Sequence, residues 1–187
     1  MLPGMDGRLV SAAFLEAEIP AADEIAERAR REFQRARIAA GDLGPASPAR
    51  AVMERAAAPL AAVLGFDRPS RIESADRLTA ATLDGGQRPV ALIATVWGEA
   101  FDPLWRIAVI EAQRRGAGWC LLADGMRLRI VDATRVYARR SLDFDLDLAD
   151  DQPRTFAALW RTCHASALTG RRKPRTSTGR PSSTSPG

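Results

Sequence analysis

The segment from Val90 to Trp97 is the feature that most constrains the fold. Its eight residues, VALIATVW, are almost continuously apolar and rich in β-branched side chains, which is typical of a strand that is buried on both faces. Asp102-Pro103 follows and predicts a helix start, because aspartate caps helices and proline is accepted in their first turn. This helix is expected to end at Gly116, and Trp119–Ala123 is the next predicted strand. The three elements predict a strand–helix–strand unit with a right-handed crossover.

The flanking segments predict further strands. Asp124-Gly125 is a two-residue hairpin signal, and in the return strand Met126–Val131 apolar residues alternate with arginines. Residues 142–146 alternate leucine or phenylalanine with aspartate and predict a last strand. Ile72–Leu83 is interpreted as one strand with a bend, and Asp84-Gly85-Gly86 as the turn after it.

Helical patterns surround these strands. Asp23–Ala40 has helical spacing of apolar residues, and Ser47-Pro48 starts a second helix that ends at Gly65, with Pro59 expected to kink or split it. Pro153–Ala167 is the predicted closing helix. The core-facing residues predicted for the first helix are Ile25, Ala29, Phe33 and Ala36. The sequence therefore predicts an α/β protein with a mixed β-sheet flanked by helices.

The charge of the chain is concentrated in one segment. The net charge of +4 comes from 27 basic and 23 acidic residues, and five of the basic residues follow Gly170. Residues 1–169 carry 22 arginines against 23 acids, a net charge of −1, so the body of the chain is not basic in the way typical of nucleic-acid binding. We expect a helical segment and linker over 1–46, an α/β domain over 47–168, and a disordered basic tail over 169–187.

Composition also bears on localisation. No stretch approaches the roughly 18 apolar residues of a membrane span, and residues 1–20 lack the apolar region of a secretory signal. The two cysteines, Cys120 and Cys163, do not form a disulfide framework. These observations predict a cytoplasmic protein with no membrane partner.

Few groups in the sequence point to chemistry. The phosphate-binding loops G-x-G-x-x-G and G-x-x-x-x-G-K, the serine motif G-x-S-x-G and the methyltransferase loop D/E-x-G-x-G-x-G are absent, and the chain has one histidine. Carboxylates remain at Glu99 and Asp102, where helix capping is the simpler interpretation. Asp143, Asp145 and Asp147 form a row that is interpreted as a solvated strand face, with a metal site as the alternative.

The run from Trp97 to Leu146 resembles the region upstream of the methylase core in type IIG-like restriction–modification methylases of bacterial defence systems. At the turn, this chain has aspartate-glycine where the family more often has asparagine-glycine. The matching segments are Trp97-Gly98-Glu99, Asp102-Pro103-Leu104-Trp105-Arg106, Gly118-Trp119-Cys120, Asp124-Gly125, Leu128–Ala133, Arg135, Tyr137–Arg140 and Phe144-Asp145-Leu146.

The resemblance implies a nuclease fold of the PD-(D/E)xK type, that is, a restriction-endonuclease-like core. Its chemistry needs one acid after the second strand and an acid-x-Lys on the third, which together hold Mg²⁺. Asp84, or Asp76 if the turn is misplaced, supplies the first acid, but Ala94 and Val96 stand where the second acid and the lysine should be. The one lysine is Lys173 in the tail. We therefore expect no catalytic, cofactor-binding or metal-ligating residues, and Mg²⁺ only if residual nuclease activity exists.

These expectations define one main hypothesis and two alternatives. The main hypothesis is a truncated, catalytically degenerate N-terminal module of a restriction–modification methylase that binds duplex DNA or other subunits of the system. The first alternative is a structural or interaction fragment without a ligand, and the second is a residual metal-dependent nuclease that uses Asp84 with Glu99 or Asp102. The tail is interpreted as the product of a frameshift or premature stop, with a phosphate-gripping basic tail as the competing interpretation.

Five arginines on or near the hairpin are the candidates for phosphate contacts, because guanidinium groups suit phosphate oxygens. The alternative is a solvated strand face, balanced by neighbouring aspartates such as Asp132, Asp143 and Asp145. The five candidates are Arg127, Arg129, Arg135, Arg139 and Arg140.

Overall fold

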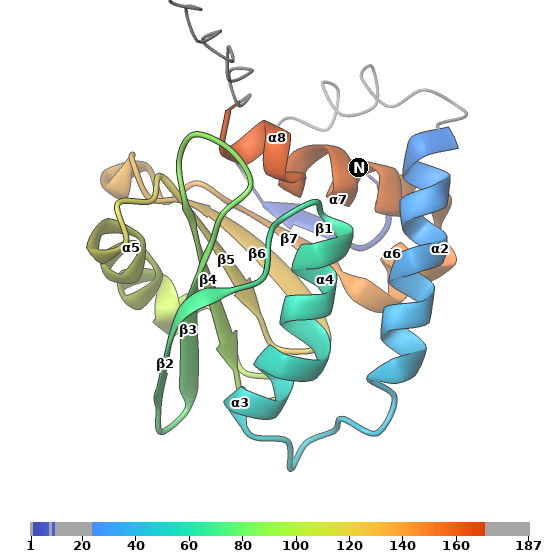
Figure 1. The fold of residues 1–187 in the computed structure, drawn as a ribbon, viewed down its shortest axis with the longest axis horizontal. Helices are drawn as coiled ribbons and strands as arrows, with labels where there is room; N and C mark the ends of the chain where they lie inside the picture. The colour runs from blue at the N-terminus through green and yellow to red at the C-terminus, as the bar shows by residue number, and fades with distance from the viewer. Residues whose placement is uncertain (1, 8, 10–23, 171–187) are drawn as a thin grey trace, which may run out of the picture.

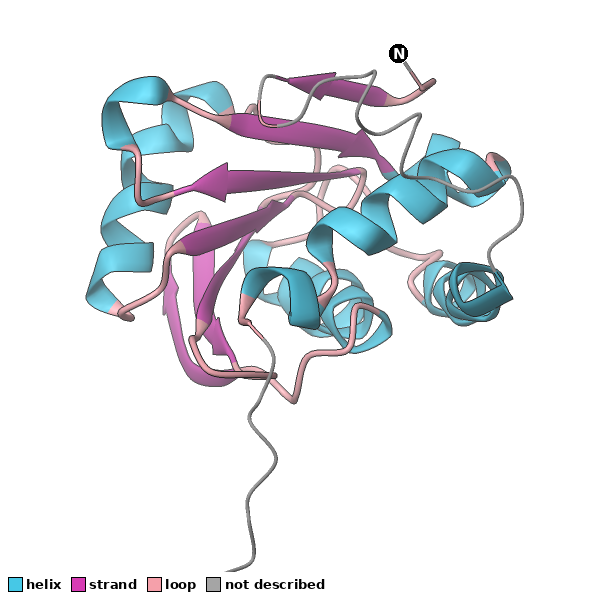
Figure 2. Ribbon diagram, turned by 90° about the horizontal axis from the view of Figure 1, so that it is seen from above, coloured by secondary structure: helices cyan, strands magenta, loops and turns pink. Residues whose placement is uncertain are grey.

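A computed structural model describes residues 2–7, 9 and 24–170, and it contains a seven-stranded mixed sheet in the order β1-β7-β6-β5-β4-β3-β2. Helices lie on both faces of this sheet (Figures 1 and 2), so the predicted α/β class is confirmed. The strands are β1 (Met5–Gly7), β2 (Ser70–Ala75), β3 (Leu78–Leu83), β4 (Val90–Thr95), β5 (Trp119–Ala123), β6 (Arg127–Asp132) and β7 (Ser141–Asp145). The helices are α2 (Glu24–Ala39), α3 (Ala49–Val52), the π-helical η1 (Met53–Ala57), α4 (Ala58–Val63), the 3-10 turn η2 (Asp102–Leu104), α5 (Trp105–Arg114), the 3-10 turn η3 (Val136–Ala138), α6 (Leu146–Asp151), α7 (Pro153–Cys163) and α8 (Ala165–Leu168).

Strand β4 is buried over its whole length, as its apolar sequence predicts. It pairs in parallel with β5 and antiparallel with β3, and α5 connects the parallel pair. Leu92 and Ala94 belong to the core beneath α2, α4 and α7, whereas Ala91 and Ile93 belong to the smaller core beneath α5. The predicted strand–helix–strand unit is therefore confirmed.

The N-terminal segment joins the same sheet and core. Met5 of β1 pairs with Phe144 of β7, and Phe33 of α2 contacts Phe156 of α7 with ring centroids 5.2 Å apart. The expected core position of Ile25 is wrong, since Ile25 is 67% exposed and Ala26 is buried in its place.

Pro59 divides the second helix, as predicted. Because proline has no N–H and its ring crowds the carbonyl four residues earlier, the helix passes through the π segment η1 just before it. The N–H of Ala58 there donates to the carbonyl of Met53, five residues back. The helix ends at Val63, two residues before the predicted end at Gly65, which has a φ of +82°.

Other boundaries also differ from the predictions. Ile72–Leu83 is not one bent strand but lies in the hairpin of β2 and β3, which turns at Asp76-Arg77. The strand predicted to reach Leu146 stops one residue earlier, because the Asp145 side chain accepts hydrogen bonds from the N–H groups of Asp147 and Leu148 and starts α6. The closing helix ends at Cys163, and α8 follows after His164.

Strand β2 forms one edge of the sheet. All six of its residues are exposed, Arg71 has a φ of +47°, and its pairing with β3 shifts register between Ser70 and Glu73.

Among the described residues, no helix is long and apolar enough to cross a membrane.

The hairpin between β5 and β6 turns one residue later than predicted, with Gly125 at a φ of +89° and the N–H of Asp124 bonded to the carbonyl of Arg127. A Cβ atom at Gly125 would collide with the ring of Trp97.

We expect Gly125→Ala to destabilise the protein by about 2–4 kcal/mol, because the alanine would have a strained left-handed backbone and would overpack against the ring of Trp97. Gly116→Ala is the control, because Gly116 has a φ of +66° and open space around it. Equal losses of unfolding free energy in urea would contradict a packing role for Gly125.

His164 predicts a pH dependence of stability. Its Nδ1 accepts a hydrogen bond from the N–H of Ser166 at 3.2 Å, its ring lies 4.4 Å from that of Trp160, and burial lowers its pKa. The folded state disfavours the protonated ring. The contribution of His164 to the free energy of unfolding is therefore fully present above the unfolded pKa of about 6.5, and it is lost as the pH falls through the lower folded pKa. The NMR titration of this single histidine should show a midpoint below 6.5.

The variant His164→Asn isolates this effect. An asparagine oxygen can accept the same backbone hydrogen bond without titrating. The variant should therefore remove the loss of unfolding free energy between about pH 7.5 and pH 5 that His164 causes. An unchanged pH profile would show that His164 does not cause it.

Candidate functional site

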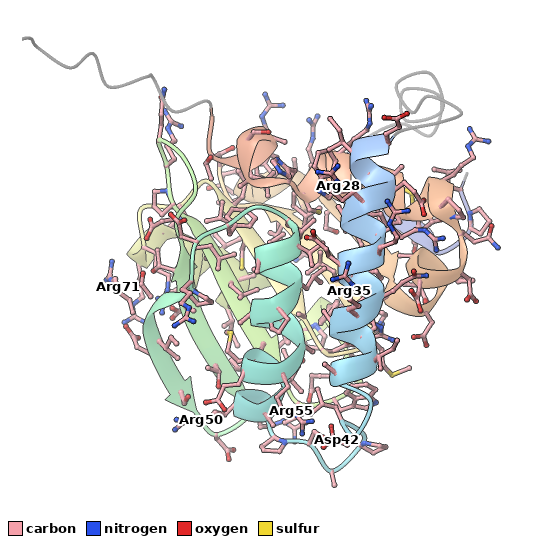
Figure 3. All side chains as sticks on the ribbon, turned by 45° about the vertical axis from the view of Figure 1, so that its right-hand side comes forward. Arg28, Arg35, Asp42, Arg50, Arg55 and Arg71 are labelled. Carbon is pink, nitrogen blue, oxygen red and sulfur yellow. The ribbon has the colours of Figure 1, made fainter. Side chains whose placement is uncertain are left out.

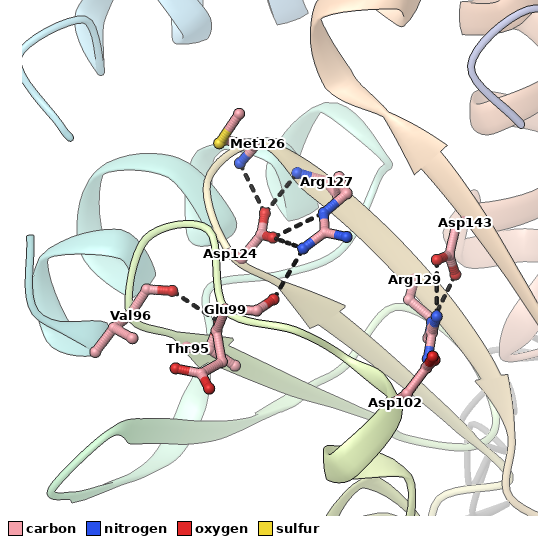
Figure 4. Close-up of polar contacts among 9 residues, drawn as sticks. All are labelled: Thr95, Val96, Glu99, Asp102, Asp124, Met126, Arg127, Arg129 and Asp143. Carbon is pink, nitrogen blue, oxygen red and sulfur yellow. Dashed lines mark hydrogen bonds and ion pairs between the residues drawn. The ribbon is translucent and has the colours of Figure 1, made fainter. Parts of the chain in front are cut away.

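The carboxyl ends of the parallel strands β4 and β5 lie side by side. Ligands of open α/β sheets bind just beyond such carboxyl ends. Polar groups that follow the two strands converge there with groups from β6 and β7 (Figure 4). We call this group the edge cluster. It consists of Glu99, Asp102, Asp124, Arg127, Arg129 and Asp143.

Asp124 is the most buried carboxylate of the edge cluster, with a relative exposure of 0%. Its Oδ1 accepts hydrogen bonds from the N–H groups of Met126 and Arg127, at 2.8 and 2.6 Å. Its Oδ2 accepts from Nε and Nη2 of Arg127, at 3.0 and 2.7 Å. The guanidinium group also donates to the carbonyl of Glu99 at 2.9 Å and lies 4.9 Å from the ring centroid of Phe101. Both oxygens of Asp124 are thus committed within the fold.

Arg129 links two other carboxylates of the cluster. It donates to both oxygens of Asp143, at 2.6 and 2.9 Å, and to Asp102 at 2.7 Å. Burial by itself lowers the pKa of Arg129, but the hydrogen bonds that it donates to Asp143 and Asp102 outweigh burial and raise the pKa above its usual value. Arg129 is therefore a permanent cation with fixed partners.

The edge cluster leaves little positive charge for a ligand. Its two guanidinium groups stand against four carboxylates, for a net charge of −2; they bind three of these carboxylates, and the fourth, Glu99, pairs with Arg77. The three aspartates that are predicted to form a solvated strand face each have a partner within the fold. Asp143 binds Arg129, Asp145 caps α6, and Asp147 pairs with Arg37 of α2.

The structure does not bring the predicted nuclease positions together. Leu83 pairs with Val90 and Thr79 pairs with Ala94, so Asp84 follows β3 at the opposite end of the strand pair from Ala94. Asp84 is exposed, Ala94 is fully buried and Val96 is partly buried. Within the described ranges, no group of three or more histidine, cysteine, aspartate or glutamate side chains is arranged to hold a metal ion.

The alternative acid, Asp76, lies at the end of the strand pair that is near the edge cluster, since Leu78 pairs with Thr95. An open depression beside it is lined by residues 45–48, Arg77 and 96–100. The Arg77 and Glu99 side chains in this depression form an ion pair with each other, and this pairing raises the pKa of Arg77. The charged groups of the depression thus satisfy each other.

The other three candidate arginines lie at the far end of β6, in the segment 134–140, which we call the Tyr137 loop. Arg135, Arg139 and Arg140 are exposed, and their side chains make no hydrogen bond or ion pair with any residue that the structure describes. Tyr137 between them is 103% exposed relative to a free residue. No acid occurs between Asp132 and Asp143, so the loop carries a charge of +3.

The base of the Tyr137 loop is held by the fold. The carboxylate of Asp132, which is 6% exposed, accepts from the N–H and the hydroxyl of Thr134, at 2.9 and 2.6 Å. The N–H of Asp132 donates to the carbonyl of Arg140 at 3.0 Å. Arg139 has a φ of +42°, which is uncommon for a residue with a side chain.

Tyr137 entered the sequence prediction only as part of the resemblance. One signal could have singled it out, because it is the single tyrosine of the chain and stands in an acid-free run between arginines.

The edge cluster predicts a stability effect that the nuclease alignment does not. We expect Asp124→Ala to lower the unfolding free energy by about 2–4 kcal/mol, because two backbone N–H groups and the Arg127 guanidinium lose a buried acceptor. Asp84→Ala is the control and should change it by less than about 0.5 kcal/mol, because Asp84 is exposed. Urea unfolding of the two variants gives both values. Equal effects would contradict the structural role of Asp124.

Comparison with protein-family models, with curated proteins and with solved structures gives no match. The resemblance to restriction–modification methylases therefore stays a prediction. The structure divides the five candidate arginines into two groups. Arg127 and Arg129 have partners in the edge cluster, whereas Arg135, Arg139 and Arg140 present their charge to solvent.

Proposed function

We propose that this chain is a non-catalytic binding module that contacts the phosphates of duplex DNA through the Tyr137 loop. The observation that carries the proposal is the set of three exposed arginines that have no acidic partner in the described part of the chain and that stand in a run without acids, between Asp132 and Asp143. A phosphate that binds them does not have to displace an internal carboxylate, as it would at Arg127 or Arg129. Guanidinium groups also match phosphate oxygens in shape and hydrogen-bonding pattern.

We further propose that the module is a catalytically degenerate, restriction-endonuclease-like part of a restriction–modification methylase. Support comes from the order of the elements, in which the meander β2-β3-β4 is followed by the crossover helix α5 and by β5. A nuclease fold of the PD-(D/E)xK type, which the resemblance implies, likewise has a helix, a three-strand meander, a crossover helix and a further strand. Other subunits of such a system are the alternative partners of the same surface.

A residual nuclease has less support. Asp84 lies away from the strand end that carries Val96, Glu99 is paired with Arg77, and Asp102 is paired with Arg129. A metal ion at this edge would have to compete with arginines for each of these two carboxylates.

The DNA-binding proposal is tested with the full chain and a short duplex, by fluorescence anisotropy at several salt concentrations. Replacing Arg135, Arg139 and Arg140 with alanine should weaken binding and reduce the slope of log K against log salt by about 2.7, since each phosphate contact contributes about 0.9. The tail is the same in every variant, so its contribution to the slope cancels.

The matched control removes three exposed arginines elsewhere. Arg28, Arg31 and Arg35 lie on α2, with Arg28 and Arg35 visible along its outer side in Figure 3. Their replacement with alanine removes the same charge and should leave the slope nearly unchanged. Equal losses in the two triple variants, or no binding of the duplex at low salt, would overturn the proposal.

A further inference from the structure

We infer that the Tyr137 loop takes a single-stranded segment of nucleic acid, with one base stacked on the ring of Tyr137 and the phosphates on either side held by the arginines. The inference rests on the phosphate contacts of the proposed function and goes beyond it, because it adds a single strand with an unstacked base as a ligand of the same loop. It concerns the same loop but depends on a side chain that the charge argument does not use.

The first observation is the complete exposure of the Tyr137 ring. At 103% relative exposure it gains nothing from the core, unlike Trp97 and Trp119, which pack against the main core. Large aromatic side chains usually contribute to stability through the area that they bury. Tyr137 does not, so its ring is available as a contact surface.

The second observation is the way the loop is held. Both ends are fixed at Asp132, through Thr134 at one side and the carbonyl of Arg140 at the other. The ring stands on the single 3-10 turn η3, which the hydrogen bond from Ala138 N–H to the Arg135 carbonyl closes at 3.0 Å. The ring is therefore carried by an anchored turn and not by a long tether, which lowers the entropy cost of stacking.

The third observation is the position of the charges. Arg135 precedes Tyr137 by two residues, and Arg139 follows it by two. A nucleic-acid strand likewise places a phosphate on each side of every base. The interleaving of arginines with an aromatic ring is the combination by which proteins bind single strands, because the ring stacks on a base and the cations follow the backbone.

A duplex can contact the arginines of this loop through its phosphates, but it offers little to the ring of Tyr137. In its interior both faces of each base are covered by neighbouring bases, so a protruding ring can stack only at an end or after unstacking a step, which costs a few kcal/mol. A single strand offers free base faces without that cost. The shared chemistry is an unpaired base between phosphates, and it can come from DNA or RNA.

The test compares the full chain with Tyr137→Ala and Tyr137→Phe, using a fluorescent oligothymidine strand, the same strand as a duplex, and a strand with abasic sites. We expect Tyr137→Ala to weaken single-strand binding by about 5- to 150-fold, the range for loss of one stacked base. The phenylalanine variant should retain the wild-type affinity within about 3-fold, since the ring remains. Val136→Ala removes a neighbouring exposed apolar side chain and controls for local disturbance of the loop.

The abasic strand gives the second readout. Wild type and Tyr137→Ala should bind it equally, because it has phosphates and no base to stack. An oligouridine strand of the same length shows whether RNA is accepted as well as DNA.

The outcomes separate this inference from the proposed function. If Tyr137→Ala leaves single-strand binding unchanged while the loop arginine variant weakens duplex binding, the stacking inference is overturned and the proposed function stands. If Tyr137→Phe loses as much as Tyr137→Ala, the ring is not the determinant and the inference is also overturned. If the wild-type chain binds no strand and no duplex at low salt, the proposed function itself falls.

Discussion

Burial of β4 on both faces is the constraint on which the rest of the structure depends. A strand whose side chains on both faces are apolar needs a layer of helices above and another below, and a hydrogen-bonding strand at each side. The chain meets the first need with α4 on one face and α5 on the other, and the second with β3 and β5. Placing α5 between β4 and β5 makes these two strands parallel, which in turn brings their following loops together at the edge cluster.

Arginine provides the positive charge throughout the described fold, and this choice shapes the edge cluster. A guanidinium group donates several hydrogen bonds in one plane, so Arg129 can bind Asp143 through two atoms and Asp102 through a third. An ammonium group has no such planar fork. The number of arginines in a sequence is thus a poor measure of affinity for phosphates, because part of them act as cross-links between strands.

The sequence was most informative where the determining pattern is local. Strands β4 and β5 and helix α5 follow from runs of apolar residues and from the proline after Asp102. The expected capping role of Asp102 is wrong, because the helix starts as the 3-10 turn η2 without a side-chain cap and Asp102 binds Arg129 instead. The hairpin of β2 and β3 was missed because its turn, Asp76-Arg77, contains neither glycine nor proline, and because an entirely exposed β2 has no alternation to detect. The three residues of β1 are too few for any periodicity.

The candidate site was less predictable than the fold because its contacts are not local. Alternation places Arg127 and Arg129 on one face of β6, but it cannot show that the partners of Arg129 are supplied from 14 and 27 residues away. The exposure of Tyr137 likewise depends on how the loop is anchored. Whether a given arginine is a structural cross-link or a surface charge is decided by those distant partners.

The form of β2 has a consequence for association of the sheet. A regular edge strand presents unpaired N–H and carbonyl groups at a constant spacing, which another strand can join. The left-handed Arg71 and the register shift after Ser70 break that spacing in β2, and the opposite edge, β1, has only three residues. Neither edge among the described residues offers a long straight template, so the sheet is protected against extension by a second sheet and against the aggregation that such pairing starts.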